Sequence, residues 1–103
     1  MLRRLQRQLA PWVAHNFGDP PWTQPFMGVV EEVGELSHAL LKQEQGIRGA
    51  WDDHEDAAKD AVGDVVIFLA CLCHLRGWDL ESIVENTWAK VQERDWKARP
   101  SNG

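Results

Sequence analysis

Tyrosine is absent from this sequence of 103 residues, and cysteine occurs only twice. Cys71 and Cys73 lie two positions apart in a segment of helical pattern, which directs their side chains away from each other and excludes a disulfide between them. Because there is also no CxxC motif and no secretory start, we expect a reducing, cytoplasmic compartment. The longest apolar run, Val65 to Cys73, has nine residues, which is too short to cross a bilayer. No membrane association is expected.

The sequence also has no basic block. Eleven Lys and Arg stand against sixteen Asp and Glu, and the basic residues are spread along a chain of formal charge -5. A groove for polymeric nucleic acid is therefore not expected, whereas a small anionic ligand is compatible with this charge if a metal ion bridges it. Tryptophan is abundant instead, with six residues. Since Trp combines a large apolar area with one N–H donor, some of these rings should line a cleft or an interface.

No segment shows the alternation of a β-strand, and four segments show helical periodicity. The pattern predicts an all-α fold with helices at about residues 2–15, 23–45, 52–76 and 80–96. Gly77 is expected to end the third helix and Asp79 to cap the fourth. We predict a single domain over residues 1–103, with a frayed tail at about 98–103. A chain this short buries a modest fraction of its surface alone, so a partner subunit is expected.

An acidic cluster lies in the second predicted helix. Glu31, Glu32 and Glu35 fall within one helical turn, where like charges repel, and no basic residue lies between Pro25 and Lys42. A solvated acidic face is the commoner explanation of such a motif when it occurs alone. Here the neighbours are small or apolar, and a second acidic pair follows in the third helix. A metal site therefore becomes the favoured interpretation.

The second acidic pair consists of Asp60 and Asp64. Apolar stripes on both sides predict that the third helix is buried on most sides over residues 61–73. Asp64 would then lose hydration unless a cation met it. Ligation by carboxylate oxygens alone suits Mg²⁺, with Mn²⁺ as a possible substitute. The metal-ligand candidates are Glu31, Glu32, Glu35, Asp60 and Asp64.

The segments Glu31-Glu32-Val33-Gly34-Glu35-Leu36 and Gly63-Asp64-Val65-Val66 resemble the MazG-like family of all-α nucleoside triphosphate pyrophosphohydrolases. The signature of that family is an EExxE helix, a loop and an ExxD helix, and the resemblance covers about residues 24–96. One departure is that Ala61 stands where the family has a glutamate, and Asp60 is the candidate to replace it. The resemblance implies hydrolysis between the α- and β-phosphates, giving a (d)NMP and pyrophosphate. It also implies a four-helix, MazG-like bundle completed by homo-oligomerisation, as a homodimer or homotetramer.

The expected mechanism is metal-assisted hydrolysis. Metals would clamp the polyphosphate and lower the pKa of a bound water, which Glu32 or Glu35 would orient or deprotonate as the catalytic carboxylate. The substrate-binding candidates are cationic, amide or aromatic side chains. They are Lys42, Arg48 in the glycine loop, the helical stripe Asn86, Lys90 and Arg94, and Trp12 and Trp22 for stacking on the base.

Three functions remain open at this point. A purine dNTP such as dGTP is the first expectation for the substrate, by analogy with the family alone. An all-α dUTPase or dCTP pyrophosphatase would share the carboxylates, and only the base pocket would distinguish it. A non-catalytic helical dimerisation module would have no use for Asp64 and would tolerate Glu35→Gln.

Overall fold

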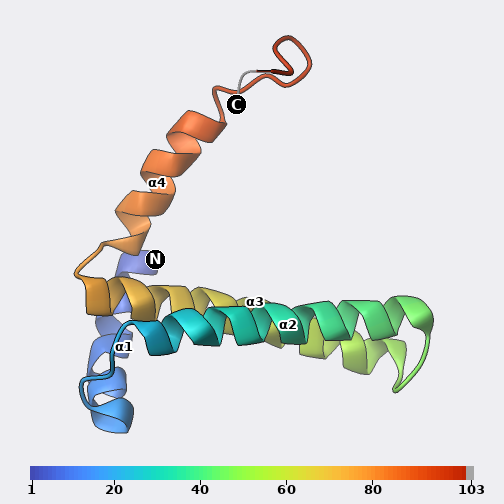
Figure 1. Cartoon of the computed structure of the whole chain (residues 1–103), viewed down its shortest axis with the longest axis horizontal. Helices are drawn as coiled ribbons and strands as arrows, with labels where there is room; N and C mark the ends of the chain where they lie inside the picture. Colours follow the sequence, from blue (N-terminus) through green and yellow to red (C-terminus); the bar gives the residue numbers. More distant parts are fainter. Residues whose placement is uncertain (102–103) are drawn as a thin grey trace.

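The computed structural model describes residues 1–101, and every regular element within them is an α-helix (Figure 1). The helices are α1 (Leu2–Phe17), α2 (Thr23–Gln45), α3 (Trp51–Arg76) and α4 (Leu80–Val91). The predicted all-α class with four helices is thus confirmed over this range. Residues 92–101 form turns joined by backbone without regular structure, and the last two residues of the predicted tail, 102–103, lie outside the described residues.

The helices α2 and α3 form a long antiparallel hairpin (Figure 1). Its interface contains small side chains, because Ala39 of α2 and Ala58 and Ala61 of α3 are all at most 5% exposed. Gly46 ends α2 in the left-handed conformation at φ 68, which glycine adopts without strain. At this end of the hairpin, Nε2 of the buried His54 hydrogen-bonds the carbonyl of Ile47 at 2.9 Å.

The helix α1 crosses the open end of the hairpin (Figure 1), and residues of α1 and of the end of α3 form most of the main buried cluster. Burial raises the pKa of both the Cys71 and Cys73 thiols, which are free as expected. The cluster joins three helices, since it consists of Leu9, Val13, Ala70, Cys71, Cys73 and Leu80.

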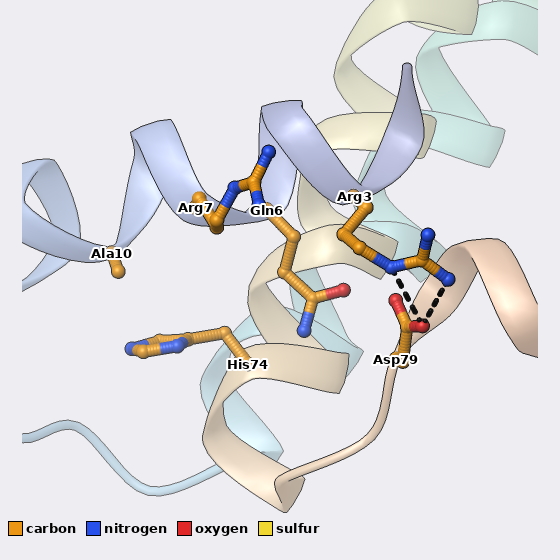
Figure 2. A pocket seen from close by; sticks show the side chains of 6 residues that line it. All are labelled: Arg3, Gln6, Arg7, Ala10, His74 and Asp79. Atoms are coloured by element: carbon orange, nitrogen blue, oxygen red, sulfur yellow. Dashed lines mark hydrogen bonds and ion pairs between the residues drawn. The ribbon is translucent and has the colours of Figure 1, made fainter.

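The first turn of α4 is held by polar side chains of α1, which we call the α1–α4 clamp. Arg3 forms ion pairs with Asp79 at 2.7 Å and with Glu81 at 2.6 Å, and Figure 2 shows its two hydrogen bonds to Asp79. The Gln6 amide donates to the Trp78 carbonyl at 2.6 Å and accepts from the Leu80 N–H at 3.0 Å. The hydrogen bond from Arg3 is the main cause that lowers the pKa of Asp79. Asp79 occupies the predicted N-cap position of α4, but its carboxylate makes no capping hydrogen bond to the backbone and accepts from the Arg3 and Ser82 side chains instead.

The end of α4 differs from the sequence prediction. The helix ends at Val91, whereas the periodicity predicted that it would continue to about Trp96. Beyond Val91, the Asp95 carboxylate accepts the backbone N–H groups of Lys97 and Ala98 at 3.1 and 3.0 Å. Such local bonds compete with the helical hydrogen bonds of the backbone. Gly77 ends α3 in the left-handed conformation, as expected.

The burial of α3 was also predicted wrongly. Val62 and Ile67 are 51% and 41% exposed, and Asp64 is exposed as well. The prediction assumed that every apolar stripe is covered, but α1 covers only one side of the hairpin at one end. Helical spacing places a further set of exposed apolar residues on the side away from Glu31 and Glu35. This outer face consists of Phe26, Val30, Val33, Leu40 and Val62.

The single chain is extended for its size. Its radius of gyration is 17.0 Å, against about 13 Å for a compact domain of this length. Its accessible surface is 7618 Å², whereas a compact monomer of 11.7 kDa exposes about 5,900 Å². Among residues 1–101, no helix combines the length and the apolar character needed to span a membrane.

We expect Arg3→Gln to loosen α4 while leaving the hairpin intact, because it removes both ion pairs of the α1–α4 clamp. Amide hydrogen exchange at neutral pH should become faster in α4 and stay unchanged in α2 and α3. Since the pKa of Asp79 is lowered in the folded chain, the clamp should be complete above the ordinary carboxyl pKa and lost as the pH falls through the lowered value. Arg4→Gln is the control, and equal exchange in both variants would contradict the clamp.

Candidate active site

A cavity of about 840 Å³ lies between α1, α2 and α3. Its lining is mostly apolar, with Trp12 of α1 in one wall and Phe68 and Cys71 of α3 in another. Glu31 of α2 and Asp64 of α3 are the two charged residues of this lining. A pocket of this volume with a few polar groups is typical of a small-molecule site.

The predicted carboxylates meet beside this cavity. Burial raises the pKa of Glu32, and the negative charges of Asp64, Glu31 and Glu35, in that order, raise it further. Glu32 is half-buried on the stripe of α2 that faces α3, whereas Glu31, Glu35 and Asp64 are exposed. The structure therefore brings Asp64 of α3 near the three glutamates of α2, although it lies far from them in the sequence.

The fifth metal-ligand candidate, Asp60, is placed differently. It is exposed on α3 one turn before Asp64 and is not part of the cavity lining. Ala61, where the resemblance expects a glutamate, is 3% exposed in the interface with α2. The Asp60 carboxylate can therefore approach a bound metal only from the exposed surface of the hairpin, on the side where Asp64 lies.

The carboxylates of this cluster fit a Mg²⁺ ion that is shared with a bound polyphosphate. Among residues 1–101, no three His, Cys, Asp or Glu side chains converge closely enough to hold a metal ion by themselves. Mg²⁺ usually keeps several waters and binds through one or two carboxylates together with substrate phosphates. Carboxylates that line an open cavity suit an ion shared with a polyphosphate better than an ion enclosed by protein alone.

The two tryptophans predicted to stack on a base have different surroundings. Trp12 lines the cavity and meets Phe17 edge to face, with 5.6 Å between the ring centroids. Trp22 lies outside the lining, and the guanidinium of Arg76 is 5.3 Å from its ring centroid. Phe26 packs against Trp22 as well, at 6.4 Å between centroids. Of these two tryptophans, only Trp12 is positioned to contact a ligand in the cavity.

The basic and amide residues predicted to bind substrate are not part of the cavity lining within one chain. Lys42 donates to the Gln45 side chain at 2.9 Å near the hairpin loop, and Arg48 lies in that loop with φ 60. Asn86 and Lys90 lie on α4, which packs on α1 and α3 but not on α2 within residues 1–101. Arg94 follows the end of α4, so it does not continue the predicted helical stripe.

The comparison with protein families matches the carboxylate helices. The family model described as the MazG nucleotide pyrophosphohydrolase domain matches residues 25–98. The chain belongs to the MazG family. Comparisons with curated proteins and with solved structures returned no match. Family membership supports nucleotide pyrophosphohydrolase activity, which is a hydrolase activity on acid anhydrides.

The MazG match begins at residue 25, so the wall that α1 contributes lies outside it. Sequence reasoning had suggested Trp12 but missed most of the cavity lining. Phe68 and Cys71 looked like ordinary core residues, because an apolar side chain at helical spacing carries no sign of a cavity beside it. Gly28 gave a weak signal, since glycine is unfavourable inside a helix, but Gly34 and Gly63 share it.

A smaller cavity of about 310 Å³ lies between α1 and the end of α3 (Figure 2). Arg3, Gln6 and Asp79 line it and already bind one another or the start of α4. Arg7 and His74 complete its polar lining. This cavity therefore belongs to the α1–α4 clamp rather than to the site beside the carboxylates.

Proposed function

We propose that this MazG domain is a Mg²⁺-dependent (d)NTP pyrophosphohydrolase that cleaves between the α- and β-phosphates and releases a (d)NMP and pyrophosphate. The observation that carries the proposal is that one cavity has an aromatic wall at Trp12 and the carboxylates Glu31 and Asp64 in the same lining. A nucleoside can occupy the apolar part while its polyphosphate extends toward the carboxylates. Mn²⁺ is the expected substitute for Mg²⁺.

The carboxylates have separate roles in this proposal. Glu31, Glu32, Glu35 and Asp64 would hold the metal, and the exposed Asp60 would assist directly or through water. When bound, the metal supplies a water of lowered pKa and neutralises charge on the polyphosphate. Glu32 or Glu35 orients this water or accepts its proton during attack on phosphorus.

A purine dNTP such as dGTP is our proposed first substrate. The cavity volume of about 840 Å³ lies toward the upper end of the range of about 300–1,000 Å³ for ligand pockets, which supports a two-ring base. A dUTPase or dCTP pyrophosphatase is the alternative that shares the carboxylates. A non-catalytic dimerisation module is the alternative outside enzymes, and the aromatic cavity beside the carboxylates argues against it.

The proposed active form is a homodimer or homotetramer. The chain exposes roughly 1,700 Å² more than a compact monomer of its mass, and a standard interface buries about 800 Å² per partner. The outer face offers an apolar surface for a second copy. Since α4 does not pack on α2 of its own chain, Asn86, Lys90 and Arg94 would approach the phosphates from a second copy.

We expect Glu35→Gln and Asp64→Asn each to lower kcat by about 100-fold or more, since a positioned carboxylate contributes 10²- to 10⁴-fold. Both residues are exposed, so the melting temperature should change little. The assay is a panel of NTPs and dNTPs with Mg²⁺ or Mn²⁺, in which ³¹P NMR identifies the products. Asp53→Asn, in the first turn of α3, is the control. Orthophosphate as the first product would overturn the assigned cleavage position, and full activity of both variants would favour the non-catalytic alternative.

We expect Trp12→Ala to raise KM for dGTP by about tenfold, because base–aromatic stacking contributes about 1–3 kcal/mol per base. Trp12→Phe should retain most of the affinity. Trp22→Ala should leave KM nearly unchanged, since the Trp22 ring packs against Arg76 and Phe26 outside the cavity. Steady-state kinetics would place the base elsewhere if Trp22→Ala had the larger effect.

We expect Leu40→Glu to convert the oligomer into monomers, because it puts a charge on the outer face at a residue that is 45% exposed in the single chain. Sedimentation velocity at tens of micromolar protein measures the change. His15→Glu adds the same charge at the exposed end of α1 and serves as the control. A wild-type chain that sediments as a monomer would refute the proposed assembly.

A further inference from the structure

Gly28 of α2 lies directly against the ring of Phe68 of α3. A Cβ atom built at Gly28 would be 2.5–2.8 Å from three ring atoms, Cε1, Cδ1 and Cζ. Such distances lie inside van der Waals contact, so any side chain at this position must displace the ring. The other two glycines inside these helices, Gly34 and Gly63, have no neighbouring atom within 4 Å of a built Cβ. Of these three helical glycines, Gly28 is therefore the one whose neighbouring atoms leave no room for a side chain.

Both members of this contact line the cavity beside the carboxylates. The ring of Phe68 lies over the backbone of α2, where the missing side chain of Gly28 leaves room for it. Phe68 is half-buried, and the cavity that it lines is free space beside its ring. A ring pushed away from residue 28 would consequently enter the cavity and reduce its depth.

The depth of the cavity is important because the lining contains few polar groups that could distinguish bases. Gln8 and Gln24 are the uncharged polar side chains of the lining, and both are exposed, while Glu31 and Asp64 repel rather than bind phosphate oxygens without a cation. Few groups can therefore read the hydrogen-bonding edge of a base. Apolar contact and available volume must separate one base from another.

We propose that Gly28 is a specificity-determining residue, which keeps Phe68 withdrawn against α2 and so leaves the cavity deep enough for a two-ring base. The inference rests on the proposed function, since it assigns the base to this cavity. Gly28 acts through Phe68 and contributes no group to the chemistry. Its effect is on the choice between purine and pyrimidine nucleotides rather than on turnover as such.

The test measures kcat/KM for dGTP and dCTP with Mg²⁺ in the full chain. Gly28→Ala should lower the dGTP-to-dCTP ratio by about tenfold, since a misfit of one methylene in an apolar pocket changes discrimination by 10- to 200-fold. Phe68→Leu in the Gly28→Ala background should restore the ratio, because it removes the displaced ring. Gly34→Ala is the matched control and should leave the ratio unchanged, whatever its effect on total turnover.

Phe68→Leu alone keeps the inference testable if Gly28→Ala fails to fold in a thermal melt. It enlarges the cavity, so the dGTP-to-dCTP ratio should stay the same or rise, and a fall would overturn the inference. An unchanged ratio in folded Gly28→Ala, or a lowered ratio that Phe68→Leu does not restore, would overturn it too.

Calorimetric binding of dGMP and dCMP separates this inference from the proposed function. If the wild-type chain hydrolyses no nucleotide but prefers dGMP, and Gly28→Ala removes that preference, the pocket assignment stands while the proposed reaction fails. If hydrolysis is present and the preference among monophosphates is the same in both chains, the role of Gly28 fails while the proposed reaction stands.

Discussion

The close contact between α2 and α3 positions every other part of the candidate site. Small residues make this contact possible, because Ala39, Ala58 and Ala61 are buried within the hairpin and Gly28 accommodates an aromatic ring. One result is that Glu32 lies partly covered near other carboxylates, at a raised pKa. The acidic cluster is thus a product of helix packing, in which two motifs separated by a loop become neighbours.

Around this hairpin the single chain leaves its surfaces unequally covered. The helix α1 shields the cavity side at the open end, whereas the outer face and most of α4 stay exposed. Within one chain the acidic and basic candidate residues are also separated, since the carboxylates border the cavity and the cationic residues of α4 lie away from it. An assembly of copies would join the two halves and cover the apolar outer face, which is why we connect oligomerisation with activity.

Periodicity and spacing predicted the four helices, the grouping of Glu31, Glu32 and Glu35 within one turn, and the stop at Gly77, because these depend on contacts within a few residues. That Asp64 lies near these glutamates depends on the packing of α3 against α2. The exposure of Asp64 could not be predicted, since a sequence does not say which apolar stripes its own chain covers. The end of α4 at Val91 depends on competing bonds to Asp95. The different surroundings of Trp12 and Trp22 could not be predicted either, since Arg76, which packs on the Trp22 ring, lies far from it in the sequence.

Two sides of the helix α1 make different contacts. One side carries Leu9 and Trp12 into the cavity, and the other holds the start of α4 through Arg3 and Gln6. Because a helix turns as a unit, any rotation of α1 about its axis alters both sets of contacts at once. The cavity wall and the first turn of α4 therefore depend on the same helix, which lies outside the residues that the family model matches.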